Sequence, residues 1–392
     1  MNTVKANGSI SIVIFIDALG WEVLRGRRFL EDELPFRRRL RSVLGFSSAC
    51  VPSILTGLVP RDHRHWSFFY HNPDYSPFRP LRPLRFLPDS VAGRGRVRSL
   101  LSRLVKRLYG YTGYFQLYNM PFSLIDRFDY CEKKDLFEPG GITGGPSIFD
   151  YLRQHDIPYH CSNWRESEVE NLAAAKACLA EGEVAFAFVY LAAMDSLLHQ
   201  VGKNSAAVDE KLSWYETQLR SLLATAREAY RDVRVFICSD HGMCTVERVI
   251  DIMAAVAALD LREGEDYVAT YDSTMARFWF KNDAARAAIT GMLAARPDEG
   301  RILSADELKA LGCDFEGDQY GEAIFLVRPG TLIVPSHMGT QPITGMHGYH
   351  PDHPDSDAVL LSNVATPEQL EAITDLFALM CTEASAAASS RA

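Results

Sequence analysis

Hydrophobic residues along this chain follow two patterns that alternate with each other. Three runs are almost continuously apolar and rich in β-branched and aromatic residues, which is typical of strands buried on both faces of a parallel sheet. These runs are residues 11–17, 185–192 and 233–240. The stretches between them repeat their apolar positions with a helical period and predict amphipathic helices. These helices are expected over residues 146–156, 168–182 and 206–230.

This alternation predicts an α/β fold, a three-layer α/β/α sandwich with a mostly parallel central sheet. Two regions interrupt the rhythm. Residues 66–145 are rich in aromatic residues, proline and arginine, and are interpreted as an inserted lid. Residues 262–335 are interpreted as a small α+β subdomain inserted before the last core strand. Both then belong to a single domain over residues 1–392.

A further helix is expected near the C-terminus. Thr366, Pro367 and Gln369 have the spacing of an N-cap, a first-turn proline and a capping-box side chain. We therefore expect the helix to begin there. Residues 385–392 are mostly Ala and Ser and predict a frayed end.

Composition narrows the class of protein. The chain has 392 residues, enough for one large α/β domain with insertions. Its 41 basic and 50 acidic residues give a formal net charge of −9, which does not favour non-specific binding to nucleic acid. Eight cysteines without C-x-x-C pairs are typical of reduced thiols and predict a cytoplasmic protein. The apolar run near the N-terminus is interrupted by Asp17 and too short to span a bilayer, so we expect a strand and a soluble protein, whose oligomeric state the sequence does not specify.

Acidic and histidine side chains follow each of the three apolar runs. Asp17 ends the first, Asp195 and His199 follow the second with the spacing of one helical turn, and Asp240 and His241 end the third. Because the carboxyl ends of parallel strands meet at one edge of the sheet, we expect these side chains to converge there. A glycine-flanked loop, "GMHGYHP", adds His347.

Each of these groups alone has a structural explanation: a helix cap, a surface pair or a polar turn. Together they would require several coincidences at one edge of one sheet. Aspartate and histidine without nearby cysteine suit a divalent ion such as zinc or manganese. Six ligands exceed the needs of one tetrahedral ion and fit two ions held about 4 Å apart.

These elements also occur in a characteristic order. Asp17 is followed by a hydroxyl before "PSILTGLVPRDH", then by the D-x-x-x-H pair, "SDHGM" and "GMHGY". In this order they resemble the alkaline phosphatase superfamily, and within it the type I phosphodiesterase/nucleotide pyrophosphatase branch, from residue 11 to about residue 363. The resemblance implies a two-metal hydrolase of phosphodiester or pyrophosphate bonds, with zinc or manganese as the ions. Its substrate would be a small phosphorylated molecule, a nucleotide or a phospholipid-type diester.

The resemblance also implies a role for each residue. One ion would be held by Asp195, His199 and His347, and the other by Asp17, Asp240, His241 and the nucleophile oxygen. In this superfamily the nucleophilic hydroxyl lies nine residues before the threonine of a Thr-Gly pair, and counting back from Thr56 gives Ser47. A metal ion would activate this hydroxyl in place of a general base, and the helix that starts there would stabilise negative charge.

Two neighbours of Ser47 remain alternatives. Ser48 would be the nucleophile if the loop were shifted by one residue. Cys50 lies two residues before a proline, which is similar to the sulfatase motif C-x-P-x-R, but Ile54 occupies the arginine position. A buried, unreactive Cys50 is the simpler interpretation.

The sequence departs from the phosphodiesterase branch in two ways. The nucleophile is serine where the branch usually has threonine. The branch also places an asparagine shortly after a P-x-x-H-G turn, where this chain has Arg64 in the glycine position and Phe68 near that of the asparagine. Asn72 or His65 is the candidate substitute for this phosphate-binding asparagine. A phosphomonoesterase, a phosphotransferase and a non-catalytic binding protein therefore stay open as alternatives.

The predicted lid has two features that bear on the substrate. Residues 94–110 combine apolar positions at helical spacing with arginine and lysine. One interpretation is a cationic helix that contacts a membrane surface or an anionic substrate. The other is a helix that packs on the core and leaves its arginines in solvent. Several aromatic residues either stack on a base or lipid head group or form the core of the insertion. They include Phe68, Phe69, Tyr70, Tyr114 and Phe115.

Overall fold

The computed structural model describes residues 7–87 and 94–391. Its main sheet has six strands in the order β2-β16-β7-β1-β6-β5. Strands β7, β1, β6 and β5 are parallel, whereas β16 is antiparallel to both β7 and β2. The bounds are β1 Asn7–Ile16, β2 Phe36–Leu40, β5 Tyr159–Cys161, β6 Phe186–Leu191, β7 Tyr230–Cys238 and β16 Ala358–Ser362. The three predicted strands are the adjacent central ones, which confirms the mostly parallel sheet.

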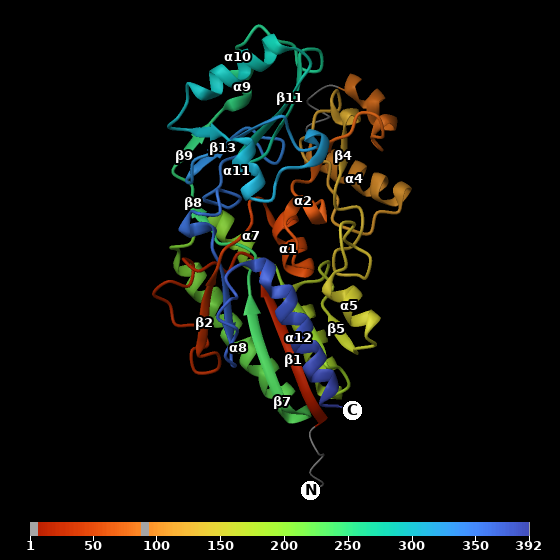
Figure 1. Cartoon of the computed structure of the whole chain (residues 1–392), viewed down its shortest axis with the longest axis vertical. Helices are drawn as coiled ribbons and strands as arrows, with labels where there is room; N and C mark the ends of the chain where they lie inside the picture. Colours follow the sequence, from red (N-terminus) through yellow and green to blue (C-terminus); the bar gives the residue numbers. More distant parts are fainter. Residues whose placement is uncertain (1–6, 88–93, 392) are drawn as a thin grey trace.

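Helices cover both faces of this sheet (Figure 1). One face carries α6 (Glu168–Glu181), α7 (Ala193–Val201) and α8 (Ala206–Ala229), and the other carries α1 (Ser47–Thr56), α5 (Ile148–Gln154) and α12 (Leu376–Ser389). Successive residues of β1 point to opposite faces, so Ile12 and Ile14 belong to one core and Val13 and Phe15 to the other. This arrangement confirms the three-layer sandwich. None of the helices within the described residues is both long and apolar enough to cross a bilayer.

A second, antiparallel sheet lies at the opposite end of the molecule from the start of β1 (Figure 1). Its order is β10-β11-β13-β12, and all four strands fall within residues 262–335. The bounds are β10 Tyr267–Tyr271, β11 Met275–Phe280, β12 Gly300–Ile302 and β13 Ala323–Val327, with α9 Ile252–Ala257, α10 Asp283–Ala294 and α11 Ala305–Ala310. Two short ladders lie between the sheets. They pair β8 (Cys244–Thr245) with β15 (Gly345–Met346), and β9 (Arg248–Ile250) with β14 (Thr331–Ile333).

The segment interpreted as a lid folds against this second sheet. It contains α4 (Gly95–Tyr109) and a ladder of β3 (Phe69–His71) with β4 (Phe128–Tyr130), and it follows the short helix α2 (Pro60–His63). Its aromatic core includes Val268 and Trp279 of the second sheet. The fully buried Arg277 of β11 ties the two together, because its guanidinium donates to Asp272 on its own sheet and to Ser67 Oγ and the Phe69 carbonyl of the insertion. One face of the second sheet therefore shares a hydrophobic core with the segment interpreted as a lid.

Glycines allow the loops at the carboxyl edge of the main sheet to pack closely. A Cβ on Gly20, in the turn after β1, would lie 2.2 Å from the Cα of Gly242, in the turn after β7. Gly348 has φ of +85°, and a Cβ there would lie 2.7 Å from the ring of Phe46. These contacts bring the turns after β1 and β7 together, and bring the loop after β15 against the start of α1.

The predicted start of the last helix is wrong. No helix begins at Thr366; α12 begins at Leu376, after a short 3₁₀ turn. The intervening segment lies beside β2 instead, where Arg38 donates to the carbonyls of Glu368 and Leu370 and the backbone of Arg41 pairs with that of residues 371–373. Residues 385–391 are not frayed either, because Ala384 and Ala387 are buried against the main sheet and Arg391 donates to the Val184 carbonyl, while residue 392 lies outside the described residues.

Candidate active site

The carboxyl edge of the main sheet gathers the acidic and histidine side chains that the sequence singled out. Asp17 directly follows β1, and Asp240 and His241 follow β7. Helix α7 starts two residues after β6 and carries the Asp195 and His199 pair. His347 follows β15, which is held in place by its ladder with β8 just beyond His241.

Four polar side chains surround one point at this edge. His241 Nε2 lies 3.1 Å from Asp240 Oδ2, 3.7 Å from Asp17 Oδ1 and 3.1 Å from Ser47 Oγ. The other ring nitrogen, Nδ1, donates to the Gly242 carbonyl at 2.9 Å, so the lone pair of Nε2 is directed at this point. A histidine that is fixed in this way by a backbone carbonyl is typical of a metal ligand.

A second group lies beside the first. His199 Nε2 is 3.3 Å and His347 Nε2 is 3.5 Å from the same carboxylate atom, Asp195 Oδ1. His199 Nδ1 donates to the Gly345 carbonyl at 2.8 Å, which again leaves Nε2 as the free ligand atom. The rings of His241 and His347 stack with their centroids 3.7 Å apart, so the two groups adjoin. Donor atoms of Asp195, His241 and His347 lie within 4.8 Å of one another, as do those of Asp17, Asp240 and His241.

Buried polar atoms at this edge lack hydrogen-bond partners among the described residues. They are Asp17 Oδ1, Asp195 Oδ1, Asp240 Oδ2 and His347 Nδ1. Burial, and then the nearby carboxylates of Asp240 and Asp195, raise the pKa of Asp17 well above its usual value. Leaving such groups unpaired costs about 1–3 kcal/mol each, and divalent cations would give the carboxylates their partners. The residues present therefore fit a two-metal centre.

A third group of potential ligands, Cys244, His353 and Asp355, lies outside this edge. The ammonium of Lys203 forms an ion pair with Asp355. Because a cation already neutralises this carboxylate, the group does not need a metal ion.

Ser47 is the first residue of α1, and its neighbours in the chain are engaged elsewhere. The Ser48 hydroxyl is buried and donates to the Trp66 carbonyl at 2.8 Å. Cys50 is fully buried in the core, with Sγ 3.5 Å from Ser42 Oγ, and burial raises the pKa of its thiol well above the usual value. Of these three side chains, only that of Ser47 contacts the acidic and histidine cluster.

A cavity of about 270 Å³ opens beside Ser47. Asp17, Asp195 and both serines line it, together with aromatic side chains that come mostly from the insertion. These are Phe68, Tyr114, Tyr118, Phe137, Trp164 and Tyr190. None of the lining residues, within the described ranges 7–87 and 94–391, is a lysine or an arginine.

Comparison with known proteins identifies the family. The family model for type I phosphodiesterase / nucleotide pyrophosphatase matches residues 12–350. The chain belongs to this family. It is thus a hydrolase that acts on phosphoric ester bonds, in a family that depends on divalent metal ions, and it falls in the alkaline phosphatase superfamily as the sequence motifs predicted. No curated protein matches the sequence significantly.

Solved structures of related phosphodiesterases share the fold. Human ectonucleotide pyrophosphatase/phosphodiesterase 5 superposes with a TM-score of 0.68 at 12% identity, and the murine protein with 0.67 at 14% identity. In both cases 96% of this chain and 95% of the other chain are covered. An inactive threonine-to-alanine variant of the murine protein in complex with AMP matches with a TM-score of 0.66. At these identities the likeness is one of fold.

The two candidates for a phosphate-binding side chain of this phosphodiesterase do not line the cavity beside Ser47. Asn72 donates to Asp129 in the insertion at 3.4 Å, and His65 faces a different cavity on the other side of residues 130–134. Nothing in the geometry supports this role for either of them. Of the chain after Arg64, Phe68 lines the cavity beside Ser47, whereas His65 lines the other one.

Several residues of the cavity escaped the sequence analysis. Tyr190 and Trp164 lie near the carboxyl ends of β6 and β5, and Ser196 adjoins Asp195, so attention to every strand end would have found them. Tyr118 and Glu132 lie in irregular parts of the insertion and carry no sequence signal. Glu132 is buried, and burial followed by the charge of Asp135 raises its pKa to about 8.

The titration of Glu132 predicts a pH dependence of stability in the metal-free protein. A glutamate in the unfolded chain loses its proton near pH 4.5, whereas folded Glu132 keeps its proton until about pH 8. The free energy of unfolding of the wild type should therefore fall between these values, by at most about 5 kcal/mol, relative to Glu132→Gln. Urea unfolding of both proteins at pH 5 to 8.5 with a metal chelator measures this difference.

Glu228→Gln, on the exposed side of α8, is the matched control for loss of a carboxyl group. If the wild type and Glu132→Gln had parallel pH profiles, or if the control changed the profile equally, Glu132 would not hold the proton.

Proposed function

We propose that the protein cleaves a phosphodiester or pyrophosphate bond in a nucleotide-type substrate, through a covalent intermediate on Ser47. The observation that carries the proposal is the lining of the cavity beside Ser47, which includes the acidic residues Asp17, Asp195 and Glu132 but no lysine or arginine among the described residues. A phosphate monoester carries a second negative charge that needs a cationic side chain, whereas a diester carries one. The cavity therefore favours a diester.

Two divalent ions are part of this proposal, zinc in the first place and manganese as the alternative, because the donors are carboxylates and imidazoles without thiolates. Asp17, Asp240, His241 and Ser47 would hold one, and Asp195, His199 and His347 the other. When bound, the ions would favour the ionised form of the serine hydroxyl and offset the charge of the phosphoryl oxygens.

Ser47 would carry out the transfer in two steps. Its Oγ forms a bond to phosphorus while the bond from phosphorus to the leaving oxygen breaks, and that oxygen departs with a proton. Water then attacks the phosphoserine, the bond from Oγ to phosphorus breaks, and Ser47 regains its proton. The start of α1, at Ser47, favours negative charge on the phosphoryl group. The inactive threonine-to-alanine variant of the murine relative supports a hydroxyl in this role.

The aromatic walls of the cavity support a nucleotide as the substrate. Phe68 and Tyr118 stack with ring centroids 5.4 Å apart, and Trp164 packs against Tyr114 at 6.1 Å. A nucleobase can stack on such rings regardless of its identity. The AMP complex of the murine relative supports the same class of ligand.

The remaining alternatives have less support. A phosphomonoesterase or phosphotransferase would use the same serine. A phosphomonoesterase would also need basic side chains around the phosphoryl group, and none lines the cavity among the described residues. A sulfatase would need Cys50, which does not line the cavity. We further propose a cytoplasmic location, since all eight cysteines are free thiols.

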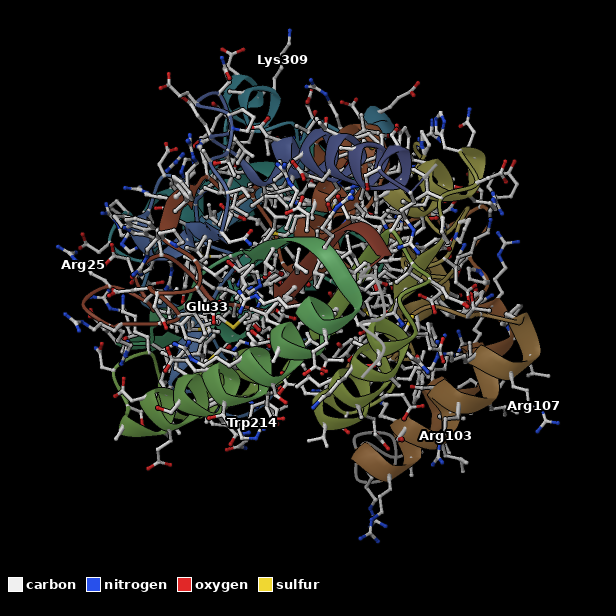
Figure 2. All side chains as sticks on the ribbon, turned by 90° about the horizontal axis from the view of Figure 1, so that it is seen from below. Arg25, Glu33, Arg103, Arg107, Trp214 and Lys309 are labelled. Atoms are coloured by element: carbon white, nitrogen blue, oxygen red, sulfur yellow. The ribbon has the colours of Figure 1, made fainter. Side chains whose placement is uncertain are left out.

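A second proposal concerns residues 94–110, which we infer to contact an anionic membrane surface. Helix α4 packs on the rest of the insertion through Arg98, Ser102 and Val105. Its opposite side leaves three leucines one turn apart unusually exposed, at 63%, 50% and 71%. They are Leu100, Leu104 and Leu108. Arginines flank them, and Figure 2 shows two of these, Arg103 and Arg107, projecting outward. Leucines beside arginines suit the interface of an anionic bilayer.

The diester preference is tested with bis(4-nitrophenyl) phosphate and 4-nitrophenyl phosphate as substrates of the zinc- or manganese-loaded protein. We expect kcat/KM to be at least about tenfold higher for the diester, because the extra charge of the monoester finds no basic side chain. A preference for the monoester would overturn the phosphodiesterase proposal.

The nucleophile is tested with Ser47→Ala and the adjacent Ser48→Ala. We expect the first to lower kcat by about 10³-fold or more while metal content, measured by mass spectrometry, stays the same. The second should keep most of the activity and lower the free energy of unfolding by about 1 kcal/mol, because it removes only the hydrogen bond to Trp66. If Ser48→Ala abolished the activity and Ser47→Ala kept it, Ser48 would be the nucleophile instead.

Membrane contact is tested by sedimentation with phosphatidylcholine vesicles that contain or lack phosphatidylserine. We expect binding to the anionic vesicles, and Leu108→Gln should reduce it severalfold because it removes an exposed apolar side chain. Val169→Gln on α6, where the valine is 63% exposed, is the matched control. Equal effects of the two variants, or no binding by the wild type, would refute the contact.

A further inference from the structure

A second, larger cavity lies on the other side of residues 130–134. Its volume is about 500 Å³, and it is bounded by α2, by the chain after β4 and by residues 315–320. The two cavities share a wall, because Tyr130, Cys131, Lys133 and Lys134 face the larger one whereas Glu132 faces the one beside Ser47. The larger cavity is therefore separate from the metal cluster.

The charges of this cavity are opposite in sign to those of the first. Four basic side chains line it, from two distant segments: Arg61, Arg64, Lys133 and Lys134. Two of them are already neutralised, since Arg61 pairs with Asp314 at 2.6 Å and Lys133 with Asp129 at 2.7 Å. Arg64 and Lys134 have no carboxylate partner among the described residues, and the only acidic side chain that lines the cavity is Glu316.

Arg64 occupies a backbone position that would suit glycine. It ends α2 with φ of 65° and ψ of 24°, the left-handed region, which costs a side-chain-bearing residue about 1 kcal/mol. Its guanidinium forms no hydrogen bond or ion pair within the described part of the chain. Arg64 is exposed as well as unpaired among the described residues, so its guanidinium is free to bind a ligand in this cavity.

The next residue gives an independent indication. His65 is 2% exposed and lines the cavity, yet its Nδ1 has no hydrogen-bond partner in the described residues. Burial lowers its pKa to about 4, so the ring is neutral and one nitrogen carries a proton that it can donate. Tyr70 and Phe315 add partly exposed aromatic surface to the same walls.

We propose that this cavity is a second ligand site, which binds a multiply charged phosphate-bearing anion through Arg64, Lys134 and His65. Guanidinium and ammonium groups are the usual partners of phosphate oxygens, and an unpaired arginine can bind them with two parallel hydrogen bonds. The ligand is either a free polyphosphate or the phosphate chain of a nucleotide whose base contacts Tyr70 and Phe315. The site does not depend on the metal cluster, so it can be tested without metal ions or turnover.

The test is calorimetric titration of the full-length, chelator-treated protein with inorganic tripolyphosphate and with ADP. We expect Arg64→Gly and Lys134→Ala each to weaken binding about tenfold or more, since each removes a charge-assisted hydrogen-bond donor. Arg64→Gly should not lower the thermal unfolding midpoint, because glycine is preferred at this φ. Tighter binding of ADP would identify a nucleotide, and equal or tighter binding of tripolyphosphate a free polyanion.

Arg107→Ala is the matched control, because it removes an exposed cation of α4 that lines neither cavity (Figure 2). It should change the affinity less than twofold. If neither probe bound, if Arg64→Gly left both affinities unchanged, or if the control lost as much as Arg64→Gly, the second site would be refuted.

Discussion

The concentration of carboxylates at one edge of the main sheet constrains the rest of this structure. Asp17 and Asp240 are both buried, and with Asp195 they lie close enough to raise the pKa of Asp17. Burial of like charges is unfavourable unless cations accompany them. The histidines do not neutralise the cluster fully, because His347 is held neutral by burial and by its histidine neighbours, which lower its pKa well below the usual value. Bound metal ions would therefore stabilise the fold as well as take part in catalysis, because they would offset the cost of burying these carboxylates together.

The insertion and the second sheet determine what can approach this edge. Arg277 joins them by donating to groups on both, and the insertion in turn supplies most of the aromatic wall of the cavity beside Ser47. A fully buried arginine is stable only when its donors are all satisfied, so this contact fixes the position of the wall relative to the sheet. The acidic and histidine cluster belongs to the sandwich, whereas most of the aromatic wall of the cavity belongs to the insertion.

The sequence predicted those parts of the structure that follow from topology or periodicity. Continuous apolar runs identified β1, β6 and β7, and the rule that parallel strands end at one edge was enough to bring Asp17, Asp240 and Asp195 together. Parts that depend on long-range contacts could not be predicted. Glu132 reaches the cavity from an irregular segment, and the capping signal at Thr366 was overridden because the neighbouring chain pairs with β2. Local preferences for helix capping, of about 1 kcal/mol, are outweighed by such tertiary contacts.

Helix α1 forms hydrogen bonds to residues near both cavities. Its first residue, Ser47, contacts His241 of the acidic and histidine cluster, while the Oγ of Ser53 in its second turn lies 2.9 Å from His63 Nε2. The backbone N–H of His65 donates to His63 Nδ1, which fixes the tautomer so that Nε2 donates to Ser53. Together with the bond from Ser48 to the Trp66 carbonyl, these contacts hold the strained turn at Arg64 against the helix that carries the nucleophile. A ligand bound at Arg64 would therefore contact a turn that is hydrogen-bonded to the helix that carries Ser47.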